Sequence, residues 1–159
     1  SRMSKTVAIF PGSFDPITIG HVKVIEDSLK FFHTIIIAIG DNNNKTKMFS
    51  LTERKKFIKT IFKNQEKIKI KTYNGLTSDF CQQQNCFNII RGVRNGNDFD
   101  YEHSISISNN CLNKKINTIF IPSVKETTHI SSSLVKEIIK KRGELMHFVP
   151  KSIISKIYN

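Results

Sequence analysis

Short apolar runs alternate with amphipathic stretches along most of this chain of 159 residues. The runs are rich in Ile, Val and Phe. Three of them are continuous, which is typical of strands that are covered on both faces of a sheet. The predicted strands are Val7–Phe10, Thr34–Gly40, Lys67–Tyr73, Phe87–Arg91 and Asn117–Pro122.

The stretches between these strands show the spacing of amphipathic helices. The clearest begins at Ser50-Leu51-Thr52-Glu53, which is a capping box, and places Phe57, Ile58 and Ile61 on one face. The predicted helices are Gly20–Phe32, Ser50–Phe62, Thr77–Asn85, Asn97–Leu112, Ser131–Lys141 and Pro150–Tyr158. The alternation predicts an α/β fold: a single Rossmann-like, doubly wound domain with a mostly parallel five-stranded sheet and helices on both faces.

Ser1-Arg2 ahead of Met3 is typical of a tag remnant, so we expect residues 1–5 to be a tail and residues 6–159 to form the domain. No apolar run approaches the roughly 20 residues of a membrane span, and no signal-peptide core is visible. The three cysteines include no C-x-x-C pair, which argues against a disulfide scaffold or a thiolate zinc site. We therefore expect a cytoplasmic protein with no membrane partner and no metal-binding residues of its own.

The net charge of +12 is compatible with several origins. A basic domain is a candidate for binding nucleic acid. A general drift in composition would also produce many lysines and few arginines, and attraction of anionic small substrates is compatible with either origin. The segment 54–71 carries eight basic residues and one acidic residue, and we interpret it as a solvated helix face with its neighbouring strand.

One polar turn stands between the first strand and the first helix. It contains Pro11, Gly12 and Pro16, and the helix begins near Gly20. Gly12 allows a close approach of the backbone to a ligand, and a helix start presents free N–H groups and a positive dipole end, so the segment predicts a phosphate site. His21 in the first helical turn is able to donate to a phosphate oxygen, although the residues alone leave open a purely structural, capping role.

Two segments carry a resemblance to known proteins. Thr18-Ile19-Gly20-His21 resembles the (H/T)-x-G-H signature of the nucleotidyltransferase superfamily. Ile130-Ser131-Ser132-Ser133-Leu134-Val135-Lys136 resembles its partner signature I-S-S-S-x-x-(R/K). The serines offer hydroxyls and N–H groups to a triphosphate, although taken alone they would also serve as ordinary helix caps.

The resemblance becomes closer when five blocks are taken together. They are 11–21, Lys45 with 48–54, 90–94, 98–102 and 130–137, and together they are similar to the bacterial phosphopantetheine adenylyltransferase family. Such a resemblance implies transfer of the adenylyl group of ATP to 4′-phosphopantetheine, which gives dephospho-coenzyme A and pyrophosphate by in-line attack without a covalent enzyme intermediate. It also implies a homohexamer built as a dimer of trimers, and dephospho-coenzyme A or coenzyme A as product or feedback ligand.

The resemblance implies catalytic roles for His21, Ser13, Lys45 and Arg91. Ser13 and His21 would bind the reacting phosphates, and Lys45 and Arg91 the phosphate of phosphopantetheine. The implied ATP-binding residues are Ser13, Phe14, His21, Gly92, Val93, Arg94, Glu102, Thr127, Thr128, His129, Ile130, Ser131, Ser132 and Ser133. The implied phosphopantetheine-binding residues are Ser13, Lys45, Leu76, Thr77, Arg91, Asn109 and Glu137.

Some of these positions also fit ordinary structural roles, and some depart from the family. Without the resemblance, Arg91–Arg94 would be interpreted as surface charges after a strand and Glu102 as an ordinary helix residue. Ser13 replaces the commoner Thr but keeps the hydroxyl. Thr127 stands where many relatives have an aromatic residue beside adenine, and Thr77 where a larger apolar residue is common.

Two other functions remain open at this point. The chain could be another small nucleotidyltransferase, acting on nicotinate mononucleotide or glycerol phosphate, but Lys45 and the 91–94 block favour phosphopantetheine. It could also be a basic nucleic-acid-binding module, but it has no RNP aromatics, GXXG loop or zinc-finger spacing, so we expect no nucleic-acid partner. No dense carboxylate cluster is present, so we expect Mg²⁺ to arrive with ATP and to be held mainly by phosphate oxygens.

Overall fold

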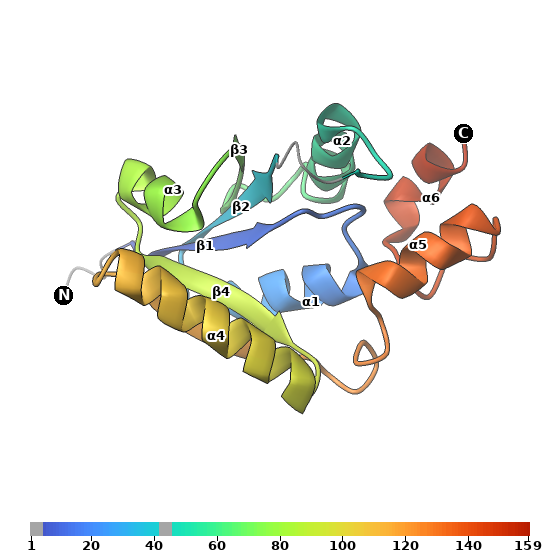
Figure 1. Cartoon of the computed structure of the whole chain (residues 1–159). Helices are drawn as coiled ribbons and strands as arrows, with labels where there is room; N and C mark the ends of the chain where they lie inside the picture. The colour runs from blue at the N-terminus through green and yellow to red at the C-terminus, as the bar shows by residue number, and fades with distance from the viewer. Residues whose placement is uncertain (1–4, 42–45) are drawn as a thin grey trace.

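The computed structural model describes residues 5–41 and 46–159; strands and helices alternate up to residue 122, and two further helices follow (Figure 1). Lys45, together with residues 42–44, lies outside the described residues. The elements in chain order are β1 (Val7–Gly12), α1 (Ile19–Ser28), β2 (Thr34–Gly40), α2 (Leu51–Ile61), β3 (Ile68–Tyr73), α3 (Thr77–Gln84), β4 (Asn88–Val93), α4 (Gly96–Leu112), β5 (Asn117–Pro122), α5 (Ser132–Lys140) and α6 (Lys151–Ile157).

The five strands form one sheet in the order β3-β2-β1-β4-β5, and every strand pair in it is parallel. Side chains alternate between the two faces along each strand, as expected for extended chain. Ala8, Phe10 and Ile37 join the core beneath α1, α2, α5 and α6, whereas Ile9 and Ile36 face the core that α3 covers. α4 packs beside α3 against β4 and β5 (Figure 1). The predicted doubly wound α/β fold with helices on both faces is therefore confirmed.

The predicted boundaries differ from the structure by more than one residue at three places. β1 continues to Gly12, and β4 continues past Arg91 to Val93, so Arg91 lies within its strand rather than at its end. Strand pairing with β2 and β5 extends both strands through residues that carry few apolar side chains. The first helix ends at Ser28 rather than Phe32, because the Ser28 hydroxyl bonds to the Val24 carbonyl and the chain then turns.

A buried arginine connects three separate segments of the chain near the carboxyl ends of the strands. Arg54 on α2 is only 2% exposed. Its Nε donates to the carbonyl of Phe49 (3.1 Å), and its Nη1 donates to the carbonyls of Ser13 (2.9 Å) and Gly40 (3.3 Å). Since buried polar groups need partners, one side chain satisfies carbonyl groups from the loop after β1, the end of β2 and the residue before the N-cap of α2.

Asp15 provides a buried negative counterpart in the same region. Its carboxylate accepts from the backbone N–H groups of Met48 and Phe49, each at 2.8 Å, and forms an ion pair with Lys136 of α5 at 3.5 Å. Asp15 is 1% exposed, so backbone dipoles and Lys136 replace its hydration. The loop after β1 is thus fixed from two directions before any ligand binds.

None of the helices in the described ranges 5–41 and 46–159 is both long enough and apolar enough to cross a membrane.

The three bonds of Arg54 lead to a stability prediction. We expect Arg54→Met to lower the free energy of unfolding by about 2–4 kcal/mol, because buried carbonyls lose their donor and each unsatisfied group costs about 1–3 kcal/mol. Urea unfolding followed by circular dichroism measures the change. Lys56→Met is the matched control, since Lys56 is exposed on the same helix and should change stability by less than about 0.5 kcal/mol. Equal losses in both variants would contradict the role assigned to Arg54.

Candidate active site

Two adjoining cavities lie at the carboxyl ends of the central strands. The order of the sheet reverses between β1 and β4, and open α/β sheets bind ligands at such a switch point. The first cavity has a volume of about 290 Å³ and the second about 470 Å³. Both are lined by Pro11, Gly12, Ser13, Arg91 and Glu102, which therefore form a shared wall.

Most of the predicted ATP-binding residues line the first cavity. They come from the turn after β1, the start of α1, the end of β4, α4 and the segment before α5, so residues distant in sequence meet here. The predicted residues on its wall are Ser13, Phe14, His21, Arg91, Gly92, Val93, Arg94, Glu102, Thr127, Ile130, Ser131 and Ser132.

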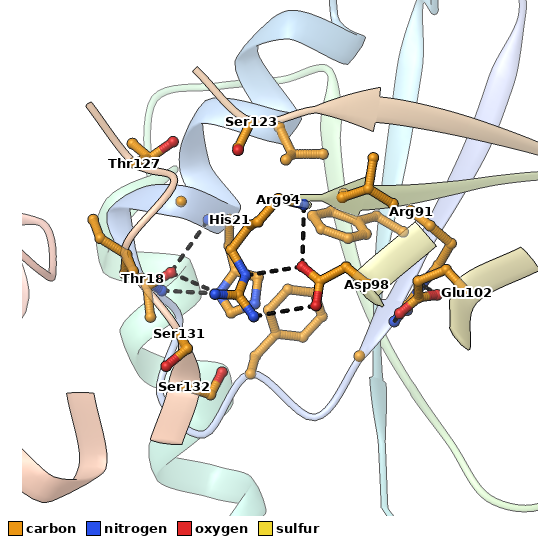
Figure 2. A pocket seen from close by; sticks show the side chains of 18 of the residues that line it. Thr18, His21, Arg91, Arg94, Asp98, Glu102, Ser123, Thr127, Ser131 and Ser132 are labelled. Carbon is orange, nitrogen blue, oxygen red and sulfur yellow. Dashed lines mark hydrogen bonds and ion pairs between the residues drawn. The ribbon is translucent and has the colours of Figure 1, made fainter. Parts of the chain in front are cut away.

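His21 occupies the first turn of α1 and forms a reciprocal capping box with Thr18. The backbone N–H of Thr18 donates to Nδ1 of His21 at 3.0 Å, and the backbone N–H of His21 donates to Oγ1 of Thr18 at 3.3 Å (Figure 2). Because a backbone N–H can only donate, Nδ1 must be the unprotonated nitrogen, and Nε2 carries the hydrogen. The capping role and a role toward a ligand thus use different nitrogens of the same ring.

The surroundings of His21 keep its ring neutral. Burial, with Arg91 nearby as a second cause, lowers the pKa of His21 to about 4. Its ring also meets the ring of Phe14 edge-on, with centroids 5.0 Å apart. At neutral pH, His21 is therefore a neutral hydrogen-bond donor, with its Nε2–H available to the cavity.

The local backbone after β1 is shaped to place the ring of Phe14. Phe14 has φ 47°, a conformation that is unusual for a residue with a side chain, and its ring packs edge-on against Phe10 at 5.3 Å. A Cβ atom at Gly12 would approach the Phe14 ring to 3.1 Å. A side chain at Gly12 would therefore disturb the packing of Phe14.

Arg91 is held tightly between α4 and β1. Its Nε and Nη2 donate to the two carboxylate oxygens of Glu102 at 2.6 and 2.7 Å, and its Nη1 donates to the carbonyl of Pro11 at 2.6 Å. Over the described residues, β4 pairs with β1 only at Ile9↔Ile89. The Arg91 side chain bridges the two strands beyond that point.

Arg94 is paired with α4 in a similar way, one helical turn earlier. Its Nε lies 3.1 Å from Asp98 and its Nη2 donates to the other oxygen at 3.3 Å, while its backbone N–H also donates to Asp98 at 3.1 Å (Figure 2). Asp98 and Glu102 are four residues apart and so share one face of the helix. The titratable groups on the described wall of the first cavity are therefore the two arginines, the two carboxylates that pair with them, and neutral His21.

The opposite side of the first cavity is formed by the segment that leads into α5. Ser131 is the N-cap of this helix, and its hydroxyl accepts from the N–H of Leu134 at 3.1 Å. Ser131 and Ser132 both line this cavity, and in Figure 2 they are drawn below Thr18. The capping interpretation of Ser131 is therefore correct, and its place on the cavity wall leaves a phosphate role open as well.

The second cavity collects two of the predicted phosphopantetheine residues that the first lacks. Thr77 at the start of α3 bonds through its hydroxyl to that of Tyr73 at 2.9 Å, and Asn109 contributes from α4. Lys47 and Tyr101 also line this cavity. Its charged groups differ from those of the first cavity, since its described wall contains Arg91, Lys47 and Glu102.

Five of the predicted site residues lie outside both cavities. His129 meets the ring of Phe148 edge-on at 6.0 Å, and Glu137 is exposed and paired with Lys141 at 3.0 Å, which lowers the pKa of that carboxyl. The remaining three are Thr128, Ser133 and Leu76. Because a helix or turn presents only part of a contiguous motif to one side, neighbouring motif residues separate in this way.

The sequence analysis missed several residues on the cavity walls. Thr18 was only one position of the first signature and Asp98 only one position of the block 98–102, yet each bonds directly to a predicted site residue. Tyr73 is the last residue of a predicted strand, and a hydroxyl at the carboxyl end of a strand is a signal that could have identified it. Lys47, Tyr101 and Ser123 had no such signal, because their place depends on how separate elements meet.

No group of three or more His, Cys, Asp or Glu side chains with the geometry of a metal site occurs in the described part of the chain. Two of the thiols there are equally unsuited to nucleophilic chemistry at the cavities. Cys81 and Cys86 are buried on the α3 side of the sheet, where burial raises the pKa of Cys81 to about 11 and also raises that of Cys86.

Comparison with known proteins shows the family of this chain. The family model described as cytidylyltransferase-like matches residues 9–138. A phosphopantetheine adenylyltransferase of Christiangramia forsetii is 44% identical over 149 residues, which cover 94% of this chain and 98% of the relative. One of Flavobacterium johnsoniae is 45% identical over 146 residues, or 92% and 95% of the two chains.

A solved structure supports the fold alone. The nicotinic acid mononucleotide adenylyltransferase of Plasmodium falciparum superimposes with a TM-score of 0.66 at 21% identity, and the match covers 96% of both chains. The sequence relatives are far closer and extend over nearly the whole chain. The chain therefore belongs to the cytidylyltransferase-like nucleotidyltransferases and, among them, to the phosphopantetheine adenylyltransferase family.

Proposed function

We propose that this chain transfers the adenylyl group of ATP to 4′-phosphopantetheine, giving dephospho-coenzyme A and pyrophosphate. Besides the family, one observation carries the proposal: two cavities meet at a wall formed by Pro11, Gly12, Ser13, Arg91 and Glu102. A reaction between two bound substrates needs such an arrangement, because the attacking and attacked phosphates must meet in line. In this proposal ATP occupies the first cavity and phosphopantetheine the second.

Groups at the shared wall, together with His21 of the first cavity, suit the transition state of the attack on the α-phosphate. The phosphate of phosphopantetheine is itself the nucleophile and is ionised near neutral pH, so no strong general base is needed. Nε2–H of His21, the Ser13 hydroxyl and the remaining N–H groups of Arg91 would stabilise charge on the reacting phosphates. No described side chain is required as a covalent nucleophile.

On the ATP side, the backbone of Gly92 and Val93, the side chain of Arg94 and the start of α5 would hold the nucleotide. A Cβ atom at Gly92 would lie 2.8 Å from Val24, so a larger residue there would disturb both α1 and this wall. Thr127 is buried and its hydroxyl bonds to the Val124 carbonyl. It offers adenine a smaller surface than an aromatic residue would.

Mg²⁺ fits this site as a companion of ATP. Both carboxylates on the first cavity wall, Asp98 and Glu102, are paired with arginines, while Ser131 and Ser132 offer neutral hydroxyl oxygens. We therefore propose that phosphate oxygens hold most of the ion's coordination sphere. When bound, it would neutralise part of the charge that develops on the phosphates.

We also propose self-association through α4, with a homohexamer as the expected assembly in the cytoplasm. α4 has 17 residues, all of them described, and its buried side chain is Glu102 rather than an apolar residue. Its apolar side chains Tyr101, Ile107 and Leu112 are 66%, 52% and 58% exposed. An apolar surface of this kind is typical of a protein interface.

Multi-angle light scattering at micromolar concentration tests the assembly. We expect a species near six times the 18.3 kDa chain mass, because the exposed apolar side chains of α4 are stabilised when they are covered. Ile107→Lys should shift the distribution toward smaller species, whereas Lys56→Met on the opposite side of the sheet should not. A stable monomer of the unaltered chain would contradict the proposal.

Pyrophosphate release with a panel of acceptors tests the reaction. We expect release to require ATP, Mg²⁺ and 4′-phosphopantetheine together, because only an acceptor that fills the second cavity places its phosphate at the shared wall. Nicotinate mononucleotide and glycerol phosphate are the comparison acceptors. Equal turnover with nicotinate mononucleotide would reject the acceptor while leaving adenylyl transfer intact.

His21→Ala tests the transition-state role. Loss of one preorganised donor should reduce kcat by about 10²–10³, because the missing bond is strongest in the transition state. ATP affinity, measured by calorimetry, should change far less, since Arg94 and the start of α5 still contact the nucleotide.

The exposed His33→Ala is the matched control for His21→Ala and should keep normal kcat. A near-normal kcat in His21→Ala, or an adenylylated enzyme trapped and seen by mass spectrometry, would reject this mechanism. Parallel losses of melting temperature and activity would indicate that the capping bonds to Thr18 are the only role of His21.

A further inference from the structure

Glu102 differs from every other residue of α4 in being buried, and it is a carboxylate. It is 8% exposed, and both of its oxygens accept from Arg91, at 2.6 and 2.7 Å. In Figure 2 its carboxylate lies against the Arg91 guanidinium. A side-on pair of this kind fixes the plane of a guanidinium as well as its position.

The hydrogen-bond count of Arg91 shows what remains for a ligand. A guanidinium has five N–H donors. Glu102 takes two of them, and the Pro11 carbonyl takes a third at 2.6 Å. Two N–H groups are left, one on each terminal nitrogen, at a side chain that lines both cavities.

We propose that Glu102 is a positioning residue: it orients Arg91 so that the two remaining N–H groups meet the phosphate of the acceptor. This inference rests on the proposed function. It is separate from the ATP contact that the family resemblance implies for Glu102, because a carboxylate that accepts two hydrogen bonds from one guanidinium still has acceptor sites for another donor.

Substitution of Glu102 distinguishes three possible roles, because each role predicts a different change in kcat or in substrate affinity. If Glu102 positions Arg91, Glu102→Gln lowers kcat, because the in-line geometry is lost. If Glu102 only balances charge, removal of an anion tightens phosphate binding and leaves kcat unchanged. If Glu102 contacts ATP, the main change is weaker ATP binding.

We expect Glu102→Gln to reduce kcat by about 10- to 100-fold and to weaken binding of 4′-phosphopantetheine severalfold. Steady-state kinetics and calorimetry with each substrate alone give these values. Glu102→Asp keeps the charge but is one methylene shorter, so it should also lower kcat. Normal turnover in Glu102→Asp, or a loss mainly of ATP affinity in Glu102→Gln, would overturn the proposal.

Asp98→Asn is the matched control, because Asp98 lies one turn away on the same helix face and pairs with Arg94 rather than Arg91. Phosphopantetheine affinity in this variant should stay within twofold of the unaltered chain. An equal loss of phosphopantetheine affinity in Asp98→Asn would show a general effect of α4 carboxylates and would overturn the specific role of Glu102.

A double-mutant cycle completes the test and is independent of any change in stability. In the Arg91→Ala background, Glu102→Gln should change kcat by less than twofold, since a positioning residue has nothing left to orient. If the double variant instead lost kcat by the product of the two single losses, the proposal would be overturned. If the unaltered chain released no pyrophosphate from ATP and phosphopantetheine, the proposed function would fail instead, so the two failures are distinct.

Discussion

The buried guanidinium of Arg54 is the constraint on which the active-site geometry depends. It donates to carbonyls in three separate segments, the loop after β1, the end of β2 and the residue before the N-cap of α2. A charge at this depth persists only where its hydrogen bonds are satisfied. The loop that contains Ser13 and Phe14 is therefore fixed from below, and Asp15 fixes the same loop from the side of α5. Ser13 and His21 can then be held in place without a bound ligand.

The pairing of strands in the parallel sheet creates the space between β1 and β4 in which the site lies. β1 pairs with β2 along its whole length, whereas its described pairing with β4 is confined to Ile9↔Ile89. Beyond that point the space between the strands is bridged by Arg91, whose side chain bonds to Pro11 on one side and Glu102 on the other. The switch in strand order that defines the fold thus also creates the opening where two substrates would meet.

Elements and motifs were predictable from the sequence to different degrees. Runs such as Thr34–Gly40 were predictable because a strand covered on both faces needs continuous apolar residues, and that need is local. His21 was found through its motif, but its capping bond to Thr18 and its protonated nitrogen depend on backbone geometry. The pairing of Arg91 with Glu102 joins a strand to a helix 11 residues later. Nothing in the local pattern indicates such a pairing, because it results from how the two elements pack.

Pairing of both cavity arginines with carboxylates has a consequence for selectivity. Unpaired arginines would attract ATP, pyrophosphate and other anions alike, and such uniform binding does not raise kcat. Held by Asp98 and Glu102, the guanidinium groups present fixed N–H directions and little net charge on this wall. The +12 charge of the whole chain therefore does not describe the first cavity, where the described wall is balanced. Discrimination among phosphorylated ligands would then depend on the direction of a few hydrogen bonds, which the sheet and α4 hold in place.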